Sequence, residues 1–171
     1  MSDGERVETM ISDWLERNYP QSYEAWYDRG KQQKLAIEIR MIPAFGAIEY
    51  NICNGGWAQF LWNCFPYWRP VIADAKEGYL LIGAPEQSAA LDILYSLCER
   101  DEKECAETIE KSMKDRLDRW GSYFSEFTSR SGSLADGDRW EELFWGDALY
   151  EKRLAWLAAN EARVRAALGL D

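Results

Sequence analysis

The sequence predicts an all-α fold, a single compact domain of roughly eight helices without a sheet. Three observations lead to this prediction. Few stretches alternate between apolar and polar residues, whereas apolar residues recur with helical spacing and capping residues recur between them. The chain has 171 residues, the length of one ordinary domain, so we take residues 1–171 as that domain. Its 47% of hydrophobic residues, among them 14% aromatic residues, are enough to build one core.

The first part of the chain is predicted to form three helices. Residues 4–18 place apolar side chains on one face, and a Tyr-Pro pair ends that helix. A short helix over residues 22–30 stops at a glycine. Residues 34–54 form a strongly apolar helix, which Pro43 kinks or restarts because proline has no backbone N–H.

Two adjacent glycines, Gly55 and Gly56, end this third helix, and we expect the left-handed backbone conformation at Gly55. A fourth helix follows over residues 57–65 and ends before a proline. A fifth helix covers residues 69–82, with Gly83 as its C-cap.

Two further helices are predicted before the one clear loop. Pro85 stands at a first-turn position, where its missing N–H is not needed, and opens a helix to about residue 98. Asp101 and Glu104 have the spacing of a capping box, which predicts that a long polar helix starts there and runs to about residue 128.

Residues 129–138 are rich in serine and glycine and are predicted to form a flexible loop. Asp138 and Glu141 have a second capping-box spacing, which indicates the start of the next helix. The last helix covers residues 147–168 and carries an apolar stripe.

The charge of the chain excludes several classes of function. Thirty acidic against twenty basic residues give a net charge of −10, which argues against direct nucleic-acid binding because phosphate contacts need a basic surface. Anionic membranes are disfavoured for the same reason. The N-terminus lacks the features of a signal peptide, and charged residues interrupt the apolar stretch over residues 35–53. We therefore expect a cytoplasmic protein with no membrane span.

The sequence contains no histidine, which removes the commonest general base and metal ligand. The four cysteines form no C-x-x-C pair and are predicted to be reduced and buried. They are Cys53, Cys64, Cys98 and Cys105. Carboxylate pairs such as Asp74 and Glu77 are abundant on helices by chance. We expect a protein that is not an enzyme and that has no metal and no cofactor.

The most distinctive local sequence is NGGWAQFLWN at residues 54–63. It combines a helix end, a two-glycine corner and the start of a new helix. Trp57, Phe60 and Leu61 recur with helical spacing and are expected to share a buried face. The residues that define the motif are Asn54, Gly55, Gly56, Trp57, Gln59, Phe60 and Asn63.

The amides of this motif allow two interpretations. Gln59 and Asn63 lie four residues apart on one helix face, where they could hydrogen-bond the exposed backbone of the corner. Alternatively, these two residues and Asn54 form the polar wall of a small-ligand pocket.

The motif resembles the NGGFxQFFxN-type signature of a family of bacterial helical proteins that takes its working name from a DNA-mimic protein. Trp57 and Leu61 replace phenylalanines of that signature. Looser agreement extends the likeness over about residues 35–160, at Glu49, Ile82–Ala84, Tyr150 and Asn160. The resemblance implies an all-helical fold and, in the name-giving case, an acidic surface that occupies the DNA-binding face of a protein.

Acidic residues gather in two segments near the ends of the chain. Residues 136–151 hold six acids against one base, and residues 3–17 hold five acids against two bases. If the segments adjoin in the fold, they make one acidic surface, whose predicted residues are Asp136, Asp138, Glu141, Glu142, Asp147, Glu5, Glu8 and Asp13. Between them, Glu107 and Glu110 precede lysines at i+4, a pattern typical of a neutralised, solvated helix.

We expect this acidic surface to bind a basic protein, either a DNA-binding protein or a nuclease. The same electrostatics serves a DNA mimic and an immunity or antitoxin-like inhibitor of a toxin or nuclease, and the sequence does not separate the two. A helical domain that binds a small ligand is a further hypothesis. The sequence also leaves open whether the chain forms a homodimer.

Overall fold

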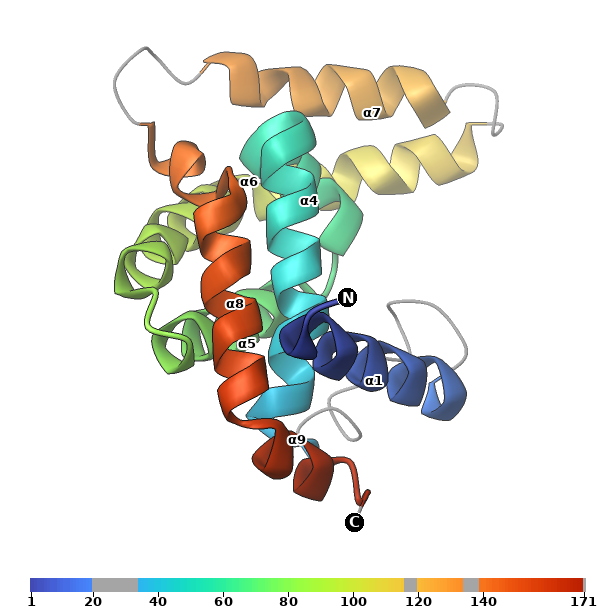
Figure 1. The fold of residues 1–171 in the computed structure, drawn as a ribbon. Coiled ribbons are helices and arrows are strands. Elements are labelled where there is room, and N and C mark those ends of the chain that lie inside the picture. Colours follow the sequence, from blue (N-terminus) through green and yellow to red (C-terminus); the bar gives the residue numbers. More distant parts are fainter. Residues whose placement is uncertain (20–33, 116–119, 134–138, 171) are drawn as a thin grey trace.

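The computed structural model describes residues 1–19, 34–115, 120–133 and 139–170 (Figure 1). The prediction of an all-α fold is confirmed, because the described residues form helices and turns and contain no strand. The elements are α1 (Asp3–Asn18), α4 (Ile37–Cys64), α5 (Trp68–Leu81), α6 (Pro85–Lys114), α7 (Trp120–Thr128), the 3-10 helices η2 (Ser129–Ser133) and η3 (Arg139–Phe144), α8 (Asp147–Ala159) and α9 (Glu161–Ala167). The helix predicted over residues 22–30 lies outside the described residues.

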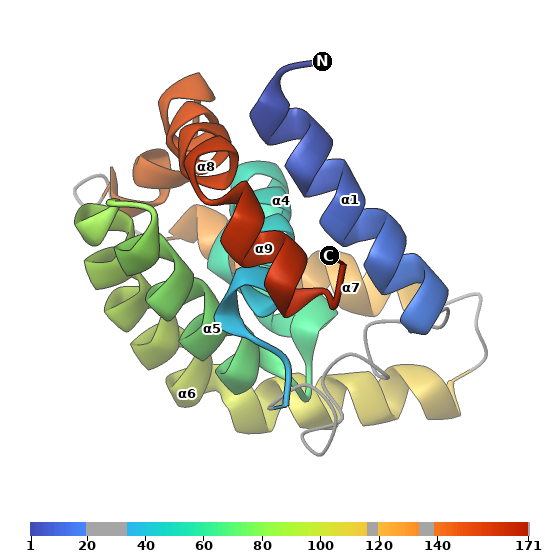
Figure 2. The ribbon, with the colours of Figure 1, turned by 60° about the horizontal axis from the view of Figure 1, so that its bottom comes forward.

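Helix α4 is the centre of the fold. Its sequence is apolar on nearly all sides, as expected for a helix that other elements surround. Figures 1 and 2 show it between α1 and α8 on one side and α6 on the other. Phe45, Ile48, Phe60 and Leu61 of α4 are fully buried. The helix does not restart at Pro43, because the helical conformation continues through this residue.

The break in α4 lies at Gly56, where φ is 72° and ψ is −166°. The expected left-handed conformation at Gly55 is therefore wrong by one residue. Beyond the break, the first N–H groups of the resumed helix have no carbonyl acceptor in a preceding turn. Trp57 donates its N–H to Glu141 Oε1 at 3.2 Å, and Ala58 donates its N–H to Ser131 Oγ at 2.9 Å. Elements η2 and η3 thus cap the second part of α4.

The break turns α4 back on itself, and side-chain amides join its two parts. Asn51 Oδ1 accepts hydrogen bonds from Asn63 at 2.7 Å and from Gln59 at 3.4 Å. In a straight helix, twelve residues would span roughly 18 Å. The interpretation that Gln59 and Asn63 bond the corner backbone is wrong, because their amides bond Asn51 instead. Asn54 bonds the carbonyl of Tyr50 in its own helix. The buried face of Trp57 and its neighbours is confirmed.

Local sequence rules hold at the junction between α5 and α6. Gly83 has a φ of 74°, and its N–H bonds the carbonyl of Leu80 while that of Ala84 bonds the carbonyl of Tyr79. These are the two bonds of a Schellman motif, which confirms the predicted end. Pro85 opens α6, as predicted.

The predicted start of a helix at Asp101 is wrong. Helix α6 runs without interruption from Pro85 to Lys114, and Asp101 and Glu104 lie inside it. Their carboxylates pair with Arg100 and Arg130. The capping-box spacing of Asp101 and Glu104 is therefore not specific for a helix start, because it also occurs inside α6, where arginine side chains bind the two carboxylates.

Three further boundaries differ from the prediction. Residues 129–133, expected in a flexible loop, form the 3-10 helix η2, and residues 134–138 lie outside the described residues. The start predicted at Asp138 and Glu141 is a short 3-10 helix. The last helix is broken at Asn160 into α8 and α9.

We predict that Gly56→Ala lowers the free energy of unfolding by about 2 kcal/mol, since a side chain at positive φ is strained by ~1–3 kcal/mol. A Cβ there would also lie 2.8 Å from Glu141 Oε1 and from Ser131 Cβ. Gly55→Ala is the matched control, because Gly55 lacks the positive φ and its new Cβ meets the flexible side chain of Gln59. Urea unfolding of both variants measures the difference, and equal losses would contradict the role of Gly56.

Candidate interaction surface

Helices α1 and α8 pack against each other, and the contacts join the first turns of α1 to α8 from about Tyr150 onward (Figures 1 and 2). The contact is close because α1 begins with Gly4: a Cβ at this position would lie 2.3 Å from the carbonyl oxygen of Leu154 in α8. In the same first turn, Arg6 of α1 binds the Glu161 carboxylate of α9 with nitrogen–oxygen distances of 2.8 and 2.6 Å. The start of the N-terminal acidic segment therefore lies next to the end of the C-terminal one.

A buried arginine ties α1 and α8 to α4. Arg153 of α8 lies with its Nε 2.9 Å from Glu8 Oε1 of α1 and its Nη1 2.9 Å from Glu49 Oε2 of α4. Tyr79 donates its hydroxyl to Glu49 at 3.2 Å. Burial raises the pKa of Glu49, although Arg153 and Tyr79 act in the opposite direction. Glu8, a predicted surface residue, is thus largely buried in an ion pair.

Glu141, also predicted for the acidic surface, is half-buried at the corner of α4. Its carboxylate accepts the N–H of Trp57, as described above. Burial raises the pKa of Glu141, and the hydrogen bond from Trp57 partly offsets this effect. The side chain therefore has a role inside the fold.

Among the other predicted residues of the acidic surface, Asp13, Glu142 and Asp147 are exposed, and Glu5 is partly exposed. Asp147 lies in the first turn of α8, directly after η3 with Glu142, and Asp13 lies on α1. Glu5 shares a capping box with Ser2, whose backbone N–H lowers the pKa of Glu5. Asp136 and Asp138 lie outside the described residues.

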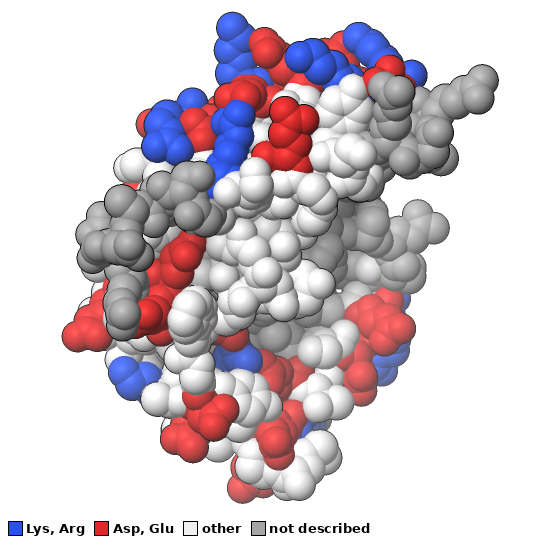
Figure 3. All heavy atoms as spheres, turned by 90° about the horizontal axis from the view of Figure 1, so that it is seen from above, with Lys and Arg blue, Asp and Glu red and all other residues white. Residues whose placement is uncertain are grey.

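The acidic side chains on this side of the molecule have few basic neighbours. Among the described residues, Asp13, Asp147 and Glu151 have no basic partner. On α6, in contrast, Glu107 pairs with Lys103 and Glu110 with Lys114. Figure 3 shows this difference: acidic and basic side chains alternate at its upper edge, where α6 lies, and acidic ones dominate its lower edge. Charge is therefore unbalanced along α1 and α8.

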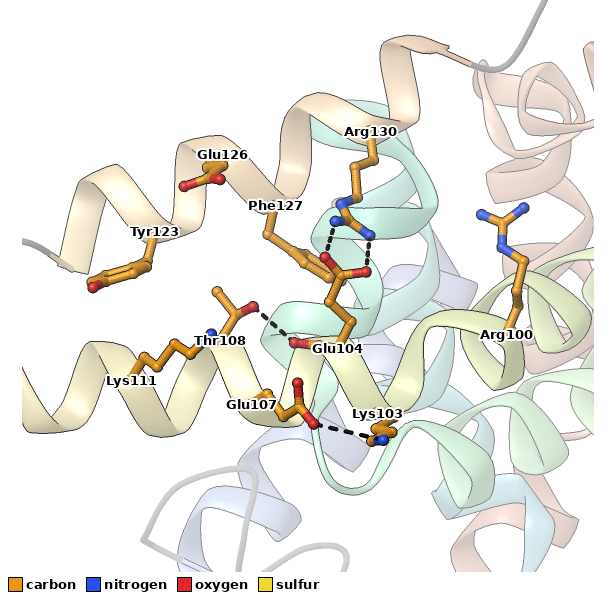
Figure 4. Close-up of a pocket in the computed structure, with 10 residues that line it drawn as sticks. All are labelled: Arg100, Lys103, Glu104, Glu107, Thr108, Lys111, Tyr123, Glu126, Phe127 and Arg130. Carbon is orange, nitrogen blue, oxygen red and sulfur yellow. Dashed lines mark hydrogen bonds and ion pairs between the residues drawn. The ribbon is translucent and has the colours of Figure 1, made fainter.

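A groove of about 510 Å³ lies between α6 and α7 (Figure 4). Four basic and three acidic side chains line it, together with Tyr123 and Phe127. Arg130 binds both carboxylate oxygens of Glu104 across its opening, one of them at 2.7 Å. This groove could not be predicted from the sequence, because its two walls come from helices whose pairing no local pattern specifies. Two of its acidic side chains pair with basic ones of the lining, Glu104 with Arg130 and Glu107 with Lys103.

The cysteines lie mostly in the core. Cys64, Cys98 and Cys105 are buried free thiols, as predicted, and burial raises the pKa of Cys64 and Cys105 to about 12. Cys53 is exposed, with its thiol 3.6 Å from the carbonyl oxygen of Phe144, so the predicted burial is wrong for this residue. In the described part of the chain, no three His, Cys, Asp or Glu side chains are grouped to hold a metal ion. Among the described helices, none has the length and apolar character that crossing a membrane requires.

We predict that Glu141→Gln is at least as stable as the natural protein at pH 7, whereas Glu141→Ala loses about 1 kcal/mol with its cap. The raised pKa means that protonation of Glu141 favours the fold. This contribution is complete below the unfolded pKa of about 4.3 and is lost as the pH rises through the folded pKa. Gln cannot ionise, so its advantage should shrink as the pH falls towards about 4. Urea unfolding across this range measures it, and a growing advantage at low pH would contradict the assignment.

Comparison with known proteins gives one match. The family described as DMP19-like protein matches residues 33–160, which include all of α4 to α8. No curated protein and no solved structure matches the chain. The matched range contains the corner at Gly56 and the elements that cap it, and it agrees with the resemblance carried by the NGGW motif. The chain belongs to the DMP19-like protein family.

Proposed function

We propose that this protein is a non-catalytic DNA mimic, whose α1 and α8 present carboxylates to the nucleic-acid-binding face of a basic protein. One observation supports the proposal: α1 and α8, which carry exposed carboxylates with few basic partners, pack against each other. The family is named for a DNA-mimic protein, which favours the same function.

The spacing of the exposed carboxylates suits this function. Asp147 and Glu151 are four residues apart on α8, and Asp13 and Glu16 are three apart on α1. Such neighbours have Cβ atoms about 5–6 Å apart. Duplex DNA carries one charge per about 1.7 Å of axis over both strands. The distance between neighbouring carboxylates in such a row therefore equals the length of duplex that carries about three phosphate charges.

The surface that we propose is smaller than the acidic segments. Its described members are Glu5, Asp13, Glu16, Glu142, Asp147 and Glu151. Asp136 and Asp138 remain proposed members next to η3. Glu8 and Glu141 support the surface from inside, since each holds a neighbouring element in place.

The candidate catalytic groups argue for binding over catalysis. Asp74 and Glu77, the carboxylate pair noted in the sequence, both bind Arg40. The buried thiols have raised pKa values, which disfavours the reactive thiolate.

We predict that Asp147→Lys combined with Glu151→Lys weakens partner binding at least tenfold, because it reverses two unpaired charges of the surface. Glu107→Lys with Glu110→Lys is the matched control: it changes the net charge equally but acts on carboxylates that lysines already neutralise. Tagged proteins would capture partners from extracts of the source cells at about 0.1 M and about 1 M salt, where the Debye length falls from about 10 Å to about 3 Å.

The captured protein should be basic, leave at high salt and be displaced by duplex DNA. Its identity distinguishes a DNA-binding regulator from a nuclease or toxin. Equal binding by the two double variants, or capture that DNA does not displace, would contradict the proposed function.

A further inference from the structure

An exposed tryptophan stands at the start of α8, inside the acidic surface. The side chain of Trp145 is 52% exposed, although tryptophan is usually among the more buried residues. Within the described residues, its ring stacks on no other ring and no cation lies over it. It occupies the position before the N-cap Gly146. A hydrophobic side chain at this position often packs on the residue at the fourth helical position, which here is Tyr150. Because more than half of Trp145 still faces solvent, this local packing does not account for it.

Elsewhere in the structure, aromatic rings and carboxylates together hold arginine side chains. Five arginines lie over rings, at 4.0 to 5.9 Å from the ring centroid. Each of them also pairs with a carboxylate. The sets are Arg69 with Trp68 and Glu102, Arg100 with Trp57 and Asp101, Arg130 with Phe127 and Glu104, Arg153 with Tyr150 and Glu49, and Arg163 with Trp156 and Glu38.

The start of α8 has the ring and the carboxylates of such a set without the arginine. Asp147 and Glu151 follow Trp145 in the first two turns of α8, are exposed, and have no basic partner among the described residues. Arg153, the nearest arginine along α8, is already held by Glu8 and Glu49. The set is therefore incomplete within the described residues.

We propose that Trp145, Asp147 and Glu151 form a docking point for an arginine side chain of the partner protein. The proposal rests on the proposed function and adds a specificity to it. A phosphate-like row of carboxylates attracts lysine and arginine alike, whereas a guanidinium can stack on an indole ring while its N–H groups bind a carboxylate. Tryptophan and arginine are also the residues that most often dominate protein interfaces. The partner surface is thus one that reads DNA phosphates with arginine.

The test uses fluorescein-labelled oligoarginine and oligolysine peptides of equal length and measures their Kd for the full chain by anisotropy. The natural protein should bind the arginine peptide about fivefold more tightly, since one cation–π contact is worth ~1 kcal/mol. Trp145→Leu should reduce the ratio of the two Kd values to about one, and Trp145→Phe should retain a preference, since it keeps a ring. Asp147→Asn with Glu151→Gln should weaken arginine binding more than Glu107→Gln with Glu110→Gln.

The outcomes separate this inference from the proposed function. The acidic surface stands if both peptides bind in a salt-sensitive way and the charge-reversal variant at positions 147 and 151 weakens this binding. The arginine site is nevertheless refuted if the two peptides then have equal Kd values. It is also refuted if Trp145→Leu leaves the preference for arginine unchanged. If neither peptide binds, both are contradicted. Thermal unfolding of Trp145→Leu and Trp145→Phe confirms that each variant is folded, so a lost preference reports on the ring.

Discussion

Gly56 turns the central helix back on itself, and the chain must then satisfy the N–H groups that this turn exposes. An unpaired N–H group in the interior would be destabilising by about 1–3 kcal/mol. Ser131 and Glu141 supply the acceptors, which holds η2 and η3 against the corner. Since α8 follows η3 after two residues, the same corner also determines where the acidic start of α8 reaches the surface.

Arg153 sets a second constraint, at the other side of α8. A buried guanidinium requires partners, and leaving one without them is strongly destabilising. Arg153 binds Glu8 from α1 and Glu49 from α4, so that one cation holds three helices. The exposed carboxylates therefore stand on helices with fixed positions. This suits a surface whose charges must match a fixed spacing on a partner.

Local signals in the sequence predicted the fold class and several helix ends, because these depend on neighbouring residues. Gly83 and Pro85 are examples, since the conformation that each residue favours fixes a boundary. The signals failed where the same residues can occupy either a helix cap or the interior of a helix. Asp101 has the spacing of a helix cap but lies inside α6, and only the surrounding helix decides between the two. The hydrogen bond from Trp57 to Glu141, 84 residues away, holds η3 beside the start of α8. No local sequence pattern predicts this contact.

The capping role of Glu141 also divides the acidic segment into positions under different evolutionary constraints. A change at Glu141 alters the corner at Gly56, so the two positions are expected to change together or not at all. Asp147 and Glu151 have no partner within the described residues, so substitutions there can adapt the surface without disturbing the fold. Relatives that serve different partners should therefore share the corner and diverge in the first two turns of α8, so that a lineage can acquire a new target while keeping its architecture.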